Sequence, residues 1–193
     1  MSPVTHFLSG WVFASCFHLN RRERAAVTLA SVAPDIDGLG ILPELLTRNS
    51  SHPLLWFSQY HHSLHTLLFA AMVSLVVLVT ARGWAAAVLA FASFHLHLFE
   101  DLLGSRGPDG DQWPIPYLKP FSDHLQLVWH GQWALNAWQN YVITIALLVL
   151  TIFIARRRGV SPVEIFSTNA NKAVVTALGG PPAPSYTSTN LSS

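Results

Sequence analysis

The chain has 193 residues, of which 51% are hydrophobic and only 11% are charged. Soluble domains are about 25% charged, so this composition argues against a water-soluble protein and favours a lipid environment. The formal net charge of +1 offers no basic footprint for nucleic acid, and the single cysteine, Cys16, excludes a disulfide framework and a thiolate metal site.

Two apolar segments open the chain, at residues 4–19 and 25–33, and Pro34 ends the second. Even if it is extended back to Arg22, a helix in the second segment would cover roughly 20 Å. The hydrocarbon core of a bilayer is about 30 Å thick. This segment is therefore expected to be tilted or only partly embedded.

Three longer apolar segments follow, at residues 62–81, 84–103 and 132–155. The first is the clearest membrane candidate, because it carries no charge from Leu64 to its end. A long loop rich in Gly, Pro, Asp and Trp is expected at 104–131. The sequence therefore predicts an all-α integral membrane bundle of about four to five apolar helices.

The domain organisation expected is one embedded unit and a tail. Residues 1–158 form the membrane-embedded domain, and residues 159–193 form a cytoplasmic tail. Ser161 and Glu164 have the spacing of a capping box, which predicts a short helix at the start of the tail. The Gly-, Pro-, Ser- and Thr-rich end of the chain is expected to be disordered.

The basic residues predict the orientation of the bundle. If the apolar segments alternate, all of the eleven Lys and Arg residues except Arg48, Arg106 and Lys119 fall on one side. The positive-inside rule makes that side cytoplasmic. The chain is therefore expected in the inner (plasma) membrane, with its N-terminus outside and its tail in the cytoplasm.

Acidic and histidine side chains gather at the outer ends of the same segments. Ionisable groups at membrane depth are costly and usually functional. We therefore expect a site at the outer ends of the helices, formed from His6, Asp35, Asp37, His61, His62, His65, His97, Glu100 and Asp101.

The spacing of these residues is typical of metal ligands. His97 and Asp101 are four residues apart, so they would share one face of a helix. His61 and His65 have the same spacing, and the turn at residues 34–37 adds two carboxylates. Nitrogen and oxygen ligands without sulfur suit a divalent metal, zinc first, with manganese or iron as alternatives. The reaction class expected is hydrolysis of a phosphoester, in a lipid or envelope component, with Glu100 or His61 as general base.

Other readings remain open. Each motif alone is weak, since a single His-x3-His pair or a Pro-Asp turn often has only a structural role. An ion transporter would carry ionisable residues at several depths, whereas here they lie at one depth. A non-catalytic membrane scaffold would close its ligand set around the metal. A soluble helical bundle is disfavoured by the long uncharged segment.

A further indication is the order of motifs along residues 5–125. It runs Thr5-His6, then Pro34-Asp35-Ile36-Asp37, then a histidine cluster at 61–66, then His97 to Asp101. This order resembles the bacterial membrane-bound predicted metal-dependent hydrolases. That family is distantly similar to the helical zinc-dependent phospholipase C and single-strand nuclease enzymes.

The resemblance implies a ligand set. It makes metal ligands of His6, Asp35, Asp37, His65, His97 and Asp101, with His61 a ligand or its support. Family members commonly have an arginine and one more residue in the third motif, so the counterpart of their first histidine is His61 or His62. The missing arginine removes a natural clamp for phosphate.

Overall fold

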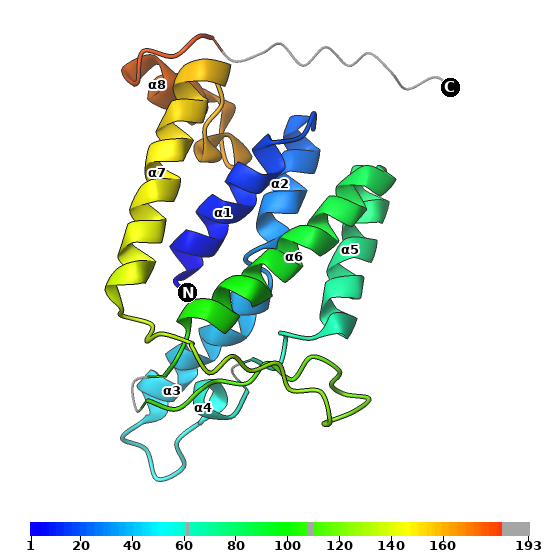
Figure 1. Ribbon diagram of the computed structural model, residues 1–193, viewed down its shortest axis with the longest axis vertical. Helices are drawn as coiled ribbons and strands as arrows, with labels where there is room; N and C mark the ends of the chain where they lie inside the picture. Colours follow the sequence, from blue (N-terminus) through cyan, green and yellow to red (C-terminus); the bar gives the residue numbers. More distant parts are fainter. Residues whose placement is uncertain (61, 108–109, 183–193) are drawn as a thin grey trace.

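The computed structural model describes residues 1–60, 62–107 and 110–182. Over these residues the protein consists of helices and irregular loops, with only isolated bridges in place of strands. The all-α class is therefore confirmed. The main helices, shown in Figure 1, are α1 (Pro3–Ser15), α2 (Arg21–Ala30), α5 (Leu67–Ala81), α6 (Trp84–Gly104) and α7 (Trp138–Arg158).

Short helices connect or extend the main ones. Between α2 and α5 lie η1 (Pro34–Gly40), α3 (Ile41–Thr47) and α4 (Trp56–Tyr60). After α7 come η2 (Pro162–Ile165) and α8 (Thr168–Ala177). The described residues between Gly104 and Trp138 form no helix, and this segment passes beneath one end of the bundle (Figure 1).

Fewer helices than expected are long enough to cross a bilayer. Among the described residues, α6 and α7 are long and apolar enough, and α2 with η1 and α3 makes a third span if that pair, bent by 56°, counts as one. α1 and α5 have 13 and 15 residues, which is roughly 20 and 23 Å of helix. The count of four to five membrane helices is thus reduced to two or three candidates.

Helix α5 begins later than the apolar run indicates. Thr66 is its N-cap, with a side chain that accepts a hydrogen bond from the amide of Phe69 at 3.2 Å. His62 has a φ of 76°, and the amide of His65 bonds to its carbonyl, so this stretch is a turn. The prediction that His65 lies on a helix is therefore wrong, because His65 precedes the first residue of α5.

Helix α7 also begins later, at Trp138 instead of Gln132. The reason is that the residues before Trp138 make backbone hydrogen bonds with the end of α6 and the residues that follow it. The Trp133 amide donates to the Leu103 carbonyl at 3.0 Å, and the Trp133 carbonyl accepts from the Arg106 amide at 3.1 Å. These bonds hold the residues before α7 against the end of α6.

The tail packs against the bundle. The predicted capping box at Ser161 is wrong, because its hydroxyl donates to Asn171 at 2.8 Å and makes no cap bond. Glu164 instead pairs with Arg24 at the start of α2. The real capping box is at Asn20, whose side chain accepts from the amide of Glu23. The predicted disorder covers residues 179–193, of which residues 183–193 lie outside the described residues.

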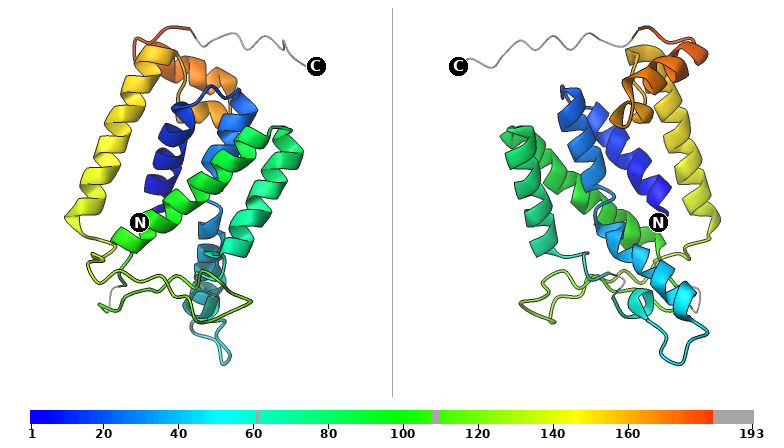
Figure 2. Two further views of the ribbon diagram at one scale, coloured as in Figure 1. Left: turned by 45° about the vertical axis from the view of Figure 1, so that its right-hand side comes forward. Right: turned by 180° about the vertical axis from the view of Figure 1, so that it is seen from behind.

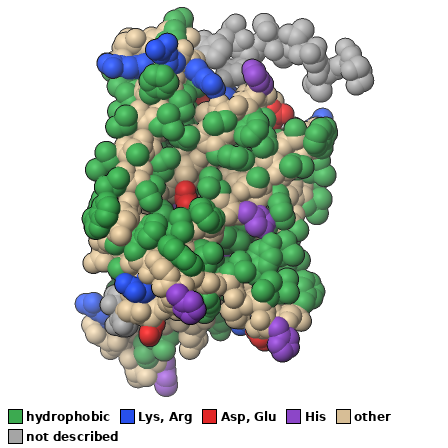
Figure 3. All heavy atoms as spheres, viewed as in Figure 1, with side chains coloured by type: hydrophobic (Ala, Val, Ile, Leu, Met, Phe, Trp, Pro, Cys, Tyr) green, Lys and Arg blue, Asp and Glu red, His purple; other side chains and the backbone are tan. Residues whose placement is uncertain are grey.

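The surface suits a lipid environment. Apolar side chains cover the flank of the bundle, and Lys and Arg gather where α7 ends (Figure 3). The exposed apolar side chains of the two outer helices include Met72, Val76 and Val79 on α5, and Ile145 and Val149 on α7. This band and the basic end agree with a membrane protein.

Candidate metal centre

Four separate segments meet at the end of the bundle opposite the basic tail. They are the start of α1, η1, the turn before α5 and the last turns of α6. Figure 2 shows from two further sides that the start of α1 lies beside the end of α6. Of the predicted residues, those buried there are His6, His62, His65, His97, Glu100 and Asp101.

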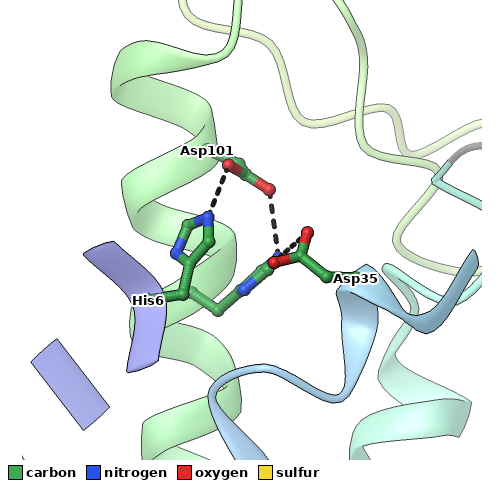
Figure 4. Close-up of side chains that lie close together, drawn as sticks. His6, Asp35 and Asp101 are labelled. Atoms are coloured by element: carbon green, nitrogen blue, oxygen red, sulfur yellow. Dashed lines mark ion pairs between the residues drawn. The ribbon is translucent and has the colours of Figure 1, made fainter. Parts of the chain in front are cut away.

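Asp101 is the centre of this cluster. Its Oδ2 lies 3.0 Å from His97 Nε2 and 3.3 Å from His65 Nε2. Its Oδ1 lies 3.2 Å from His6 Nε2, and Figure 4 shows His6 reaching it from α1. Asp35 approaches from η1, with Oδ1 at 3.9 Å from His97 Nε2.

These separations match the spacing of ligands around one ion. A tetrahedral ion with ligand bonds of about 2.0–2.1 Å holds its ligand atoms about 3.3 Å apart. The Nε2 atoms of His65 and His97 are 3.1 Å apart, close to that value. Two neutral imidazoles cannot both use a lone pair in such a contact unless a cation or proton lies between them.

The other ring nitrogen of two histidines faces an acceptor. His97 Nδ1 lies 2.8 Å from the carbonyl oxygen of Ser31, and His6 Nδ1 lies 2.6 Å from Glu100 Oε2. A carbonyl can only accept, so His97 carries its proton on Nδ1 and presents the Nε2 lone pair to Asp101. Metal-bound histidines in proteins are oriented in the same way.

His65 follows the same pattern. Its Nδ1 lies 3.4 Å from Asp37 Oδ2, which also accepts a hydrogen bond from the amide of Leu64 at 3.0 Å. Burial lowers the pKa of His65, but hydrogen bonds to Asp101 and then Asp37 outweigh it and raise the pKa to about 9. Because metals bind neutral imidazole, an ion and a proton compete for this ring.

One buried carboxylate oxygen of the cluster could bind an ion. Asp35 Oδ2 is buried and has no hydrogen-bond partner among the described residues. The ligand atoms form two groups, each lying within 4.8 Å of one another, and Asp101 belongs to both. One group is His6, Asp35, His97 and Asp101, and the other is His62, His65 and Asp101.

Close helix packing places the acceptor for His97. At Gly10 of α1, an added Cβ would lie 2.0 Å from Ser31 Oγ, so only glycine fits. Ser31 Oγ in turn donates to the carbonyl of His6 at 2.7 Å. This contact fixes the Ser31 carbonyl that accepts from His97.

We expect Gly10→Ala to weaken metal binding by about 10–100-fold, because it displaces the group that orients a ligand. Gly38→Ala is the matched control, since a Cβ there meets nothing within 4 Å. Both variants would be titrated with zinc against a chelating dye. Equal affinities for the two would contradict this role of Gly10.

His61 and Glu100 are the two residues predicted as general base. His61 lies outside the described residues, so its predicted roles as ligand and base stay predictions. Glu100 is buried against His6 Nδ1, on the side of the ring away from Asp101. That contact suits a residue that positions His6 better than a general base.

Some groups of the site were missed from the sequence. Ser105 Oγ donates to Asp101 Oδ1 at 2.5 Å, and its spacing of four from Asp101 could have shown this. The amino group of Met1 also contacts Asp101. Gln132 Nε2 donates to the Asp101 carbonyl at 2.9 Å. His95 faces away from this cluster, and its Nε2 lies 2.8 Å from the hydroxyl of Tyr117.

Two cavities adjoin the cluster. A cavity of about 300 Å³ is lined by Asp35, Asp101 and His62, among others. A larger one of about 1140 Å³ lies beside it, and both share His62, Phe57 and Trp113 in their walls. The ligand cluster is thus reachable from a space large enough for a small molecule.

Comparison with known proteins shows the family of the chain. The sequence model of the YdjM inner membrane protein family matches residues 1–176. No curated protein and no solved structure matches the chain. The matched range includes the ligand cluster, all of the main helices and nearly all of α8.

Proposed function

Because the chain belongs to the YdjM inner membrane protein family, we propose that it works at that membrane as a metal-dependent hydrolase of phosphoesters. The observation that carries this proposal is the convergence of three histidine Nε2 atoms on one buried carboxylate, Asp101. Such a set holds zinc, with manganese or iron as alternatives.

The residues of the site have different roles in this proposal. His6, Asp35, His97 and Asp101 hold one ion, and His62 and His65 with Asp101 offer a second group of ligands. Asp37 and Glu100 orient the imidazoles. A divalent ion held there supplies Lewis acidity and an activated water for attack on phosphorus.

The adjoining cavity favours catalysis over a scaffold role. A structural metal site is closed by its protein ligands, whereas a catalytic one keeps access for water and substrate. Asp35 and Asp101 line a cavity as well as the ligand cluster. The gathering of ligands at one end of the bundle also disfavours an ion path through it.

The test compares two histidines on the same helix. Wild type, His97→Ala and His95→Ala would be purified in detergent, and their metal content and phosphodiester hydrolysis measured. We expect His97→Ala to lose its metal and at least about 100-fold of its activity, since a direct ligand is worth more than a supporting residue. His95→Ala should keep both. A wild type that stays metal-free after reconstitution with zinc, manganese and iron would overturn the proposal.

The proposed orientation has its own test. The site faces the periplasm, so Cys16 at the other end of α1 faces the cytoplasm, and this exposed thiol is the chain's single cysteine. We expect a membrane-impermeant maleimide to label it only after spheroplasts are permeabilised. In a Cys16→Ser background, Ser51→Cys should be labelled in intact spheroplasts. The reverse pattern would place the site in the cytoplasm.

A further inference from the structure

The walls of the larger cavity are of two chemical kinds, polar and apolar. Near the ligand cluster its walls include His62 and Trp113, whose rings meet edge to face with centroids 5.3 Å apart. Its walls also include Leu68, Phe69 and Met72, from the first turns of α5. A molecule that fills the cavity therefore meets both polar groups and an apolar wall formed by α5.

The apolar wall reaches the flank of the bundle. Leu68 and Met72 line the cavity and are also 37% and 52% exposed at the surface. The exposed apolar side chains Val76 and Val79 continue from them along α5. In a membrane this flank faces lipid chains, so Leu68 and Met72 lie between the cavity and the bilayer.

The polar wall suits a headgroup. Glu44, Asp111 and Lys119 line the cavity on the side of α4 and the long loop. The Glu44 carboxylate is held by Ser58, whose hydroxyl donates at 2.6 Å and whose amide donates at 2.9 Å. Charged groups of both signs beside an apolar slot match a molecule with a polar head and one hydrocarbon chain.

We infer that the substrate is a membrane amphiphile that enters sideways past α5. Its chain lies against Leu68, Phe69 and Met72, and its phosphoester lies at the wall shared by the two cavities, beside His62. This inference rests on the proposed function for the reaction itself. Hydrolysis breaks one P–O ester bond, and the oxygen of water forms the new P–O bond. One proton of that water passes to the departing alkoxide, and the other leaves the new phosphate for solvent.

Binding can be tested without turnover. Purified metal-loaded protein would be cross-linked with a dodecyl phosphate carrying a diazirine at the chain end, and the labelled peptides mapped by mass spectrometry. We expect excess unlabelled dodecyl phosphate to suppress labelling of residues 68–72 at least fivefold. Labelling of residues 145–149 on α7, which face lipid generally, should not change.

A second experiment places a bulky side chain in the apolar slot. Met72→Trp fills the slot, and Val79→Trp, two turns along the same exposed face and outside the cavity, is the matched control. With dodecyl and methyl 4-nitrophenyl phosphate, we expect wild type to prefer the long chain at least tenfold in kcat/KM. Met72→Trp should lose that preference and keep its metal and its activity on the methyl ester.

The outcomes distinguish the proposal of an amphiphilic substrate from the proposal of hydrolase activity. Equal kcat/KM for both esters, with metal bound and α5 labelling that does not compete, would overturn the amphiphile and leave the hydrolase standing. Absence of metal and of all hydrolysis would overturn the hydrolase, while the cross-linking would still decide whether an amphiphile binds at α5.

Discussion

Replacement of Asp101 by alanine is expected to remove all metal from the purified protein and to abolish hydrolysis. Asp101 contacts His6, His65 and His97 within 3.3 Å, and it belongs to both groups of ligands. Its loss leaves buried imidazoles without the negative charge that balances a divalent ion. Loss of a supporting residue typically lowers metal affinity 10–100-fold, and loss of the shared ligand should exceed that.

Two companion variants sharpen this prediction. Asp101→Asn keeps the shape but removes the charge, and we expect it to bind metal at least about 100-fold more weakly than wild type. Asp123→Ala removes an exposed carboxylate of the long loop and should bind as wild type does. Metal content would be measured by mass spectrometry. Stoichiometric metal in Asp101→Ala would show that the centre does not depend on this residue.

The second large effect concerns stability. The carboxylate of Glu164 accepts from Arg24 Nε at 2.5 Å and from Nη2 at 3.1 Å, and both side chains are buried. Arg24 Nη1 also donates to the Leu19 carbonyl at 3.0 Å. Glu164→Ala removes the carboxylate that accepts from two nitrogens of this buried guanidinium, and loss of one member of a buried ion pair costs about 3–5 kcal/mol. For a protein of this length, Tm should fall by roughly 6–20 °C.

Two controls accompany the thermal unfolding in detergent. Lys172→Ala removes an exposed charge from α8 and should change the free energy of unfolding by less than about 0.5 kcal/mol. The double variant Arg24→Met, Glu164→Leu removes both charges and should recover most of the lost stability. Metal content should stay at the wild-type value throughout, because the pair lies at the opposite end of the bundle. A Tm unchanged in Glu164→Ala would contradict the buried pair.

Helix periodicity predicted part of the site. His97 and Asp101 are four apart on an unbroken apolar helix, and their ligand atoms are indeed 3.0 Å apart. A helix fixes the direction of its side chains, so spacing alone places them. The gathering of ionisable residues at one end followed from the alternation of segments in the same way.

The turn before α5 could not be predicted so well. Its apolar run continues smoothly from Leu64 into the helix, which favours an early start. Thr66 provides an N-cap signal, but whether a cap is used depends on tertiary contacts. Here the amide of Leu67 bonds to the carbonyl of Tyr117, 50 residues away, and this holds the turn open.

The acceptor for His97 could not be found from residue types at all. It is a backbone carbonyl, that of Ser31, and every residue has one. Its position depends on the close approach of α1 and α2 at Gly10, which is a tertiary contact. The pairing of the tail with α2 was missed for a related reason, since Glu164 is 140 residues from its partner Arg24.

The wide spread of the ligands along the chain sets an order for biosynthesis. His6 leaves the ribosome first, and Asp101, which both groups share, leaves it last. Until α6 is in the membrane, the nascent chain holds only scattered ligands with low affinity for any ion. If the proposed ion binds, its capture is therefore a late step of maturation that follows the insertion of α6.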